Sequence, residues 1–360
     1  MKVKQKRLFS TLLFLPLAAA RLAAFEPPLG GDVLPLLGHP GLVAGAASSA
    51  GSLFFDPFRA GGSSTAPYAA AINPALVANN QRVSLDAGYT GLFQTKSGEA
   101  ASAAHYGRLG GLVPTRWGVA ALGFQFNIGQ VPAFDIGQTA ALSAAFARDI
   151  TKNLYVGASL TGAFNVNRRG DDEAAAAALY GALGFVYRLG TLGPLREQTA
   201  AFTLSRLGKT FDSAFAASGA FPSPITPQIG YSAAVLETRA ARAGFSLDLS
   251  FPSAQNVVLD VGVQFRVARA VLVSGGYKIN FYEAVNTKTV NLPFIGISYT
   301  FTANTGMSDV LASRGWAQSE VTVGAAWNSL YDNTVQLVSG GAVINLGSSA
   351  AEAPQIIIED

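Results

Sequence analysis

The chain has 360 residues and a formal net charge of +3; 49% of its residues are hydrophobic, only 13% are charged, and none is cysteine. The charged share is roughly half of the quarter that is usual in soluble domains, while glycine is abundant at 39 residues. The lack of cysteine excludes a fold held by disulfides, and the composition suits a lipid-facing surface better than a water-facing one.

The first residues are typical of a secretory signal peptide over 1–24. A basic start, Lys2–Arg7, precedes the apolar run Leu8–Ala20, and small residues suited to cleavage follow. Cleavage is allowed before Arg21 and before Phe25, and we prefer the second position. The protein is therefore expected to be exported.

Charge argues against a nucleic-acid partner. Residues 1–24 contain five basic and no acidic residues, so the balance of 25 basic against 22 acidic residues becomes 20 against 22, or −2, after cleavage. Phosphate binding needs a surplus of Lys and Arg on one face. The mature chain has no such surplus.

Residues 25–81 are rich in Pro, Gly, Ala and Ser, and no strand period holds there. The run Leu34–Gly51 is long enough to resemble a membrane helix, but Pro35, Pro40 and four glycines argue against one. We expect residues 25–81 to form an N-terminal extension and plug, or hatch. An interfacial segment is the alternative for Leu34–Gly51.

A single helical turn is predicted near the end of this region. Asn73 is suited to be the N-cap and Pro74 the first helical position, because the Asn side chain can accept a free amide and Pro has no amide to leave unpaired. The turn runs through Ala78. From Arg82 onward, apolar and polar side chains alternate, as in a strand with one apolar face.

From residue 82 to 347, segments of about 10 to 14 alternating residues are separated by turn signals. The clearest is Val257–Val267. About 14 segments start near 83, 100, 116, 138, 153, 176, 199, 226, 242, 256, 270, 292, 320 and 334. We predict an all-β fold: a transmembrane antiparallel β-barrel of about 14 strands, residues 82–347, with the plug inside its lumen and a periplasmic C-terminal tail over 348–360.

Two other fold classes are disfavoured by the sequence. A soluble β-sandwich would alternate in the same way, but its outer face would carry many Lys and Glu residues, and here the polar face has little charge. Aromatic residues near the segment ends resemble the girdles of membrane barrels: Tyr89, Phe93, Trp117, Phe164, Phe281, Trp327 and Tyr331. A helical membrane protein is disfavoured, because the longest clean apolar run after residue 66, Ala174–Tyr187, is too short to span.

Seven charged residues lie on the polar faces of the predicted strands. A cation that faced lipid at the midplane would cost about 2–4 kcal/mol, so we expect the whole set to face the lumen. The set is Arg82, Asp86, Asp248, Asp260, Arg266, Lys278 and Glu320. Their mixed signs fit a network that grips the plug, and equally a wet lumen wall.

The residues give no sign of catalysis. Only two histidines occur, His39 and His105, and no nucleophile elbow, phosphate loop or histidine metal pair is present. His105 is the one candidate base for a barrel hydrolase, and a histidine at the membrane boundary is the simpler interpretation. We expect no enzyme activity, no metal and no cofactor.

The stretch INPALVANNQRVSLDAGYTGLF, Ile72–Phe93, resembles the place in FadL/TodX-type outer-membrane transporters of hydrophobic compounds where the hatch runs into the first strand. It is most similar to uncharacterised spirochaetal relatives of that family, and more distantly to PorV-like barrels. The resemblance implies an outer-membrane channel for passive uptake of hydrophobic small molecules, such as long-chain fatty acids or similar lipids. It also implies that a plug gates the channel, with Asn73, Pro74 and Ala75 in the gate.

Two features depart from that family. The last strand ends without a terminal aromatic residue and is followed by a tail, and the ligand contacts of the family cannot be aligned beyond the hatch. Two alternatives therefore stay open. One is a structural or scaffold barrel that docks periplasmic or surface protein partners, as the PorV-like likeness implies; the other is a general diffusion porin, against which a plug argues.

Overall fold

The computed structural model describes residues 37–44, 49–51, 66–78, 80, 82–94, 102–129, 138–169, 172–210, 225–238, 240–252, 256–268, 270–281, 284–285, 291–304, 318–330 and 333–346. The predicted signal peptide, 1–24, and C-terminal tail, 348–360, lie outside the described residues. So does much of the predicted plug.

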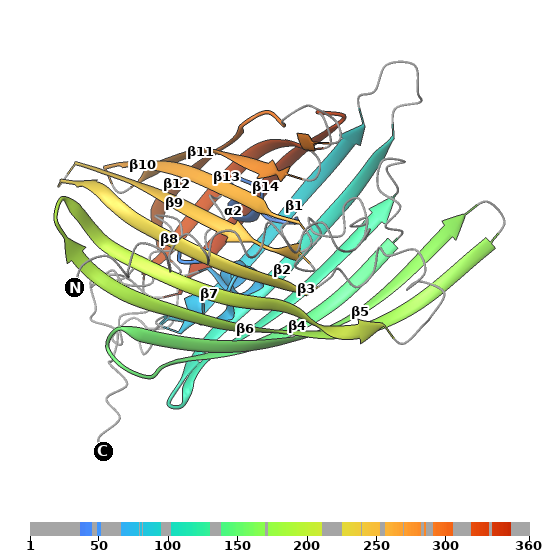
Figure 1. The fold of residues 1–360 in the computed structure, drawn as a ribbon, viewed down its shortest axis with the longest axis horizontal. Helices are drawn as coiled ribbons and strands as arrows, with labels where there is room; N and C mark the ends of the chain where they lie inside the picture. Colours follow the sequence, from blue (N-terminus) through green and yellow to red (C-terminus); the bar gives the residue numbers. More distant parts are fainter. Residues whose placement is uncertain are drawn as a thin grey trace, which may run out of the picture.

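Fourteen antiparallel strands form a closed barrel in which each strand pairs with its chain neighbours and β1 pairs with β14 (Figure 1). The closing pair runs in unbroken register from Ser84 opposite Asn345 to Gln94 opposite Val335. The prediction of an all-β barrel of about 14 strands is confirmed. The strands are β1 (Ser84–Gln94), β2 (Ala103–Thr115), β3 (Gly118–Gly129), β4 (Gln138–Asp149), β5 (Leu154–Arg169), β6 (Asp172–Leu192), β7 (Leu195–Thr210), β8 (Thr226–Glu237), β9 (Ala241–Ser250), β10 (Val258–Val267), β11 (Val271–Asn280), β12 (Phe294–Asn304), β13 (Gln318–Leu330) and β14 (Val335–Asn345).

Most strands begin within three residues of the predicted positions, and the largest differences are at β6 and β7. β6 begins at Asp172 and β7 at Leu195, where the alternation predicted 176 and 199. After its first two residues, β6 continues with the alanine run Ala174–Ala178, which has no contrast between apolar and polar faces. The register of β7 is interrupted near Glu197, so its first residues do not follow a period of two.

Side chains alternate between the two faces of the wall. In β1, Leu85, Tyr89 and Phe93 are 42–47% exposed on the outer face, whereas Ser84, Asp86 and Thr90 are buried on the inner face. Other outer residues, such as Leu122 and Leu142, are more than 60% exposed. This reverses the arrangement of a soluble protein and is the pattern of a barrel whose outer face meets lipid.

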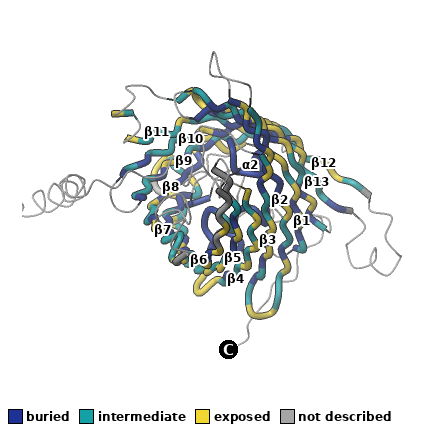
Figure 2. The backbone as a smooth tube through the Cα atoms, turned by 90° about the vertical axis from the view of Figure 1, so that its right-hand side faces the viewer, coloured by how far each residue is buried: buried dark blue, intermediate teal, exposed yellow. Residues whose placement is uncertain are grey.

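The described residues before the barrel include three short helical turns: α2 (Pro40–Val43), η2 (Pro67–Ala71) and η3 (Pro74–Val77). Figure 2, which looks into the barrel, shows α2 within the ring of strands. The residues of α2 and η3 are buried, and the three turns contact strands from both halves of the barrel. No helix in the described part of the chain is long and apolar enough to cross a membrane.

The strand pair β6–β7 carries a bulge. Between the pairs Gly181–Leu207 and Leu183–Leu204, β7 has one more residue than β6. Within this step, Arg206 has a φ of 63°, in the left-handed region that non-glycine residues rarely adopt. A bulge of this kind re-aims a side chain locally, and Arg206 lines the cavity described below.

Candidate functional site

The candidate site is the lumen, where the described residues before the barrel pack against its inner face. We call residues 37–44, 49–51, 66–78 and 80 together the N-terminal segment. Asn73 caps η3 as predicted: its Oδ1 accepts a hydrogen bond from the Ala75 amide at 2.9 Å. Its Nδ2 donates to the Ser49 carbonyl at 2.8 Å and to the Phe185 carbonyl of β6 at 3.4 Å. One fully buried side chain therefore joins the turn η3, Ser49 earlier in the chain, and strand β6 of the wall.

Pro74 and Ala75 lie directly against the wall, where two inward-facing glycines make room for the turn. A Cβ atom on Gly157 of β5 would stand 2.6 Å from the Ala75 nitrogen, and one on Gly184 of β6 would overlap the Asn73 side chain. Real Cβ atoms do not approach so closely. The close packing of η3 therefore depends on the absence of side chains at these two wall positions.

The same close approach recurs around the barrel. Glycines on other strands leave room for α2 and for the residues that flank it, because a Cβ atom there would overlap or crowd the N-terminal segment. These glycines are Gly88, Gly230, Gly296 and Gly341. The wall is thus shaped to the N-terminal segment over much of its circumference.

Two of the seven charged residues singled out in the sequence hold backbone amides of the N-terminal segment. Asp86 Oδ2 accepts from the Tyr68 amide at 2.6 Å, and Asp248 Oδ2 accepts from the Ser49 amide at 2.6 Å. Asp248 also accepts from Ser49 Oγ at 3.3 Å and from Gln228 Nε2 of β8 at 2.8 Å. Charge-assisted bonds of this kind are stronger than neutral ones.

The other five are placed as follows. Asp260 of β10 stands opposite Lys278 of β11 in the register, and Arg266 stands opposite Leu272 of β11. Glu320 of β13 stands opposite Asn345 of β14. Arg82 lies two residues before β1 and is 8% exposed.

Arg82 and Glu320 are near each other at one end of the barrel. Burial lowers the pKa of Arg82, and the carboxylate of Glu320 acts in the opposite direction. Burial also raises the pKa of the Tyr68 hydroxyl; Asp86 adds to this shift and Arg266 opposes it. The structure therefore brings Asp86, Asp248 and Arg266 to the N-terminal segment and pairs the others within the wall.

His39, to which the sequence assigned no role, is buried in the centre of this packing. It caps α2 through Nδ1, which accepts from the Gly41 amide at 3.0 Å, and its ring stacks on Tyr68 with centroids 4.0 Å apart. Burial lowers the pKa of His39 to about 3, and the nearby Arg108 adds to this shift. His39-Pro40 repeats the cap-then-proline pattern of Asn73-Pro74, a signal that could have identified it.

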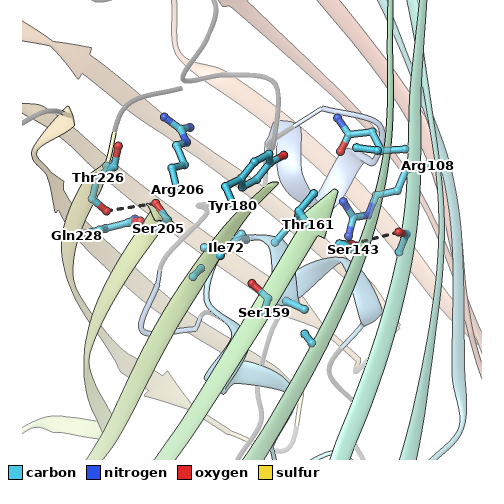
Figure 3. A pocket seen from close by; sticks show the side chains of 18 of the residues that line it. Ile72, Arg108, Ser143, Ser159, Thr161, Tyr180, Ser205, Arg206, Thr226 and Gln228 are labelled. Carbon is cyan, nitrogen blue, oxygen red and sulfur yellow. Dashed lines mark hydrogen bonds between the residues drawn. The ribbon is translucent and has the colours of Figure 1, made fainter. Parts of the chain in front are cut away.

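A cavity of about 180 Å³ lies between the N-terminal segment and the wall. One side is apolar and belongs to the N-terminal segment, with Pro67, Ala70 and Ile72. The strands supply hydroxyl groups and two arginines, Arg108 and Arg206, which Figure 3 shows on either side of Tyr180. Three of the predicted lumen charges, Asp248, Asp260 and Lys278, also line the cavity. The cavity is amphipathic, since it offers an apolar surface and hydrogen-bond donors to the same ligand.

Sequence reasoning missed both arginines. The period of two is weak around Arg108, which Gly107, Gly110 and Gly111 surround. Arg206 lies in the bulge, where one extra residue shifts the faces. Among the described residues, no group of three or more His, Asp and Glu side chains could hold a metal ion.

No family model and no curated protein matches the chain. Among solved structures, the CymD monoaromatic hydrocarbon channel has a TM-score of 0.47 at 12% identity, covering 90% of this chain and 99% of that one. The toluene transporter TodX of Pseudomonas putida has a TM-score of 0.44 at 9% identity, covering 89% and 98%. A FadL homologue of Pseudomonas aeruginosa has a TM-score of 0.39 at 13% identity, covering 80% and 95%. Likeness at this level does not establish a family for the chain.

Proposed function

We propose that the protein is an outer-membrane channel for the passive uptake of hydrophobic small molecules, exported by means of the signal peptide 1–24. The observation that carries the proposal is the reversed barrel: an apolar outer face around a polar inner face that encloses a cavity. An exposed apolar surface of this extent needs a lipid environment. The cavity in the lumen is the place where a small ligand would bind during passage.

The amphipathic cavity supports a ligand with an apolar body and a polar head. Long-chain fatty acids or similar lipids have this amphipathic character. The cavity of about 180 Å³ would hold the polar head, toward Arg108 or Arg206, and only the adjoining part of the chain, on Pro67, Ala70 and Ile72. A purely apolar ligand would make no use of the hydrogen-bonding groups that the strands supply. Passage then requires the N-terminal segment to move, since it forms one side of the cavity.

Residues 25–81 are proposed to be the plug, with Asn73, Pro74 and Ala75 at the point where it grips the wall. The bonds from Asp86 and Asp248 to this segment favour the gripping role of the lumen charges over a plain wet wall. They also argue against a general diffusion porin, whose lumen would stay open. The kinship to spirochaetal FadL-type and PorV-like barrels remains a proposal.

A second candidate function is a scaffold barrel that docks a periplasmic or surface protein. The observation in its favour is the same tight packing: six inward-facing glycines and two carboxylates hold the N-terminal segment in the lumen. Such packing would suit a segment that never moves. The two functions differ in whether the lumen binds a ligand.

Mass spectrometry of lipids that co-purify with the barrel separates the two. The channel proposal expects a specific amphiphile in near-stoichiometric amount, depleted in the double variant Arg108→Gln, Arg206→Gln. A conservative wall change outside the cavity, Val338→Leu on the outer face of β14, is the matched control. An empty lumen in the wild type, together with unchanged uptake of radiolabelled fatty acid in a deletion strain without paralogues, would favour the scaffold.

A further inference from the structure

Tyr89 and His105 form a hydrogen-bonded polar pair on the outer face of the barrel, within mostly apolar surroundings. Tyr89 Oη of β1 and His105 Nδ1 of β2 are 2.5 Å apart, and their rings stack with centroids 5.9 Å apart. Both side chains are exposed on the outer face, Tyr89 by 47%. The channel proposed above makes no use of either residue, because neither reaches the lumen.

Two glycines let aromatic rings lie flat on the wall around this pair. Gly91 is on the outer face but is buried, because the Phe93 ring lies over it; a Cβ atom at this position would stand 2.9 Å from that ring. A Cβ atom on Gly107 would overlap the Phe126 ring. Tyr89, Phe93, His105 and Phe126 together form what we call the aromatic patch.

The register places the aromatic patch at the rim of the apolar belt. His105 is level with Ile128 of β3, and Gly91 with Val338 of β14; both of these apolar side chains are more than 50% exposed. One step further along, Phe93 is level with Gln336, a polar residue whose Nε2 bonds to the Asn333 carbonyl in the turn before β14. Aromatic rings with polar tips prefer this boundary, where lipid headgroups begin.

The pair presents a hydrogen-bond donor in either tautomer of His105. If the Tyr89 hydroxyl donates to Nδ1, the ring proton is on Nε2; if Nδ1–H donates, the hydroxyl proton is free to donate instead. A donor at the edge of an apolar surface pairs best with an ionised acceptor. Phosphate oxygens of lipid headgroups are the ionised acceptors found at that depth.

We propose that the aromatic patch is a binding site for the anionic phosphate of a membrane lipid, with the acyl chains against Phe126 and Ile128. The proposal rests on the outer-membrane location proposed above. It assigns the Tyr89–His105 pair to the recognition of the headgroup, and the rings of the patch to the packing of the lipid beneath it.

The test is native mass spectrometry of the full-length protein in nanodiscs of phosphatidylglycerol that also contain diacylglycerol, which has acyl chains but no phosphate. We expect the wild type to retain phosphatidylglycerol in preference to diacylglycerol on release from the nanodisc. The double variant Tyr89→Phe, His105→Phe removes both hydrogen-bond donors and should retain roughly tenfold less phosphatidylglycerol, as expected for a lost hydrogen bond to a charged group. The matched control is Tyr299→Phe. Tyr299 of β12 is an exposed outer tyrosine, stacked on Phe301 with the same centroid distance of 5.9 Å but with no histidine in that stack, and its loss should change nothing.

The outcomes separate the possible failures. Equal retention of phosphatidylglycerol in the wild type and the double patch variant, or equal retention of phosphatidylglycerol and diacylglycerol by the wild type, would overturn the inference and leave the channel proposal intact. Displacement of the lipid by inorganic phosphate, or a dimer that dissociates in the double patch variant, would also overturn it in favour of a free anion or a second copy of the chain. Failure of the wild type to enter nanodiscs as a folded barrel would overturn both proposals.

Discussion

At Asn73, a single side chain joins the helical turn η3, the N-terminal segment at Ser49 and the wall at Phe185. The space for this junction exists because position 184 on β6 is glycine. The contact therefore depends on two residues, Asn73, which makes the hydrogen bonds, and Gly184, which has no side chain to block them. A substitution at either residue tests whether the N-terminal segment closes the lumen.

Gly184→Ala should dislodge η3 without harming the barrel, because the added Cβ atom would overlap the Asn73 side chain. We expect higher single-channel conductance in planar bilayers and faster proteolysis of the N-terminal segment. Gly162→Ala on the neighbouring β5 is the control, since a Cβ atom there meets nothing within 4 Å. If both variants conduct as little as the wild type, η3 does not close the lumen.

His39 should make the packing of the N-terminal segment in the lumen sensitive to acid. We call the segment seated when it is packed in the lumen and released when it is not. Burial holds its pKa near 3 in the seated state, whereas a released histidine titrates near 6.5. The released state therefore binds more protons between these values. The contribution of His39 to the stability of the seated state is therefore constant above about pH 6.5 and falls by about 1.4 kcal/mol per pH unit below it.

Conductance measured from pH 7 down to pH 4 should thus rise in the wild type. His39→Asn keeps a capping acceptor but cannot titrate, so its conductance should rise less. Arg108 and Tyr68 face the same ring; burial raises the pKa of Tyr68 further above this range, and arginine keeps its charge. Asp86, which accepts from the Tyr68 amide, is the same in both proteins. Identical pH profiles for the two proteins would assign the acid response to other groups.

At the scale of elements, the described N-terminal turns and the strands contribute different things. The strands satisfy their own backbone hydrogen bonds around a closed ring, which is what a lipid environment demands. The turns contribute one side of the cavity and fill space that inward-facing glycines leave open. The barrel should therefore fold without the turns, whereas the cavity should not form.

Deletion of residues 25–81 should convert a barrel with a nearly blocked lumen into a conducting one, because about 14 strands enclose a lumen that side chains alone do not fill. Single-channel recordings on the deleted and full-length proteins measure the difference. Circular dichroism of both proteins is the control for an intact β-fold. Equal and negligible conductance would mean that the segment is no plug.

At the scale of the whole molecule, the closed ring of strands predicts resistance to detergent. The protein should appear in the outer-membrane fraction and migrate differently on gels with and without heating, because closure leaves no strand edge open to unfolding. A version lacking β14 cannot pair β1 on its free side and should lose this heat-dependent shift. A soluble periplasmic pool with helical circular dichroism would refute the membrane location.

The sequence by itself determined the class of fold. A period of two is a local property, so stretches such as Val257–Val267 indicate strands without any knowledge of their partners. Because the polar faces carry few charged residues, the sequence favoured a barrel whose apolar face meets lipid over a soluble sandwich. The Asn73 cap and the turn that Pro74 begins were also predictable, because capping depends on neighbouring residues alone.

Only the tertiary structure decided how the lumen is filled. The contacts of Asp248 with Ser49, and of Gly184 with Asn73, join residues 199 and 111 positions apart in the chain, and no periodic pattern encodes such pairs. The same holds for Arg206, whose bulge shifts it out of the period that located its neighbours. Side-chain alternation follows from the geometry of one strand, whereas a cavity depends on the register and closure of all fourteen.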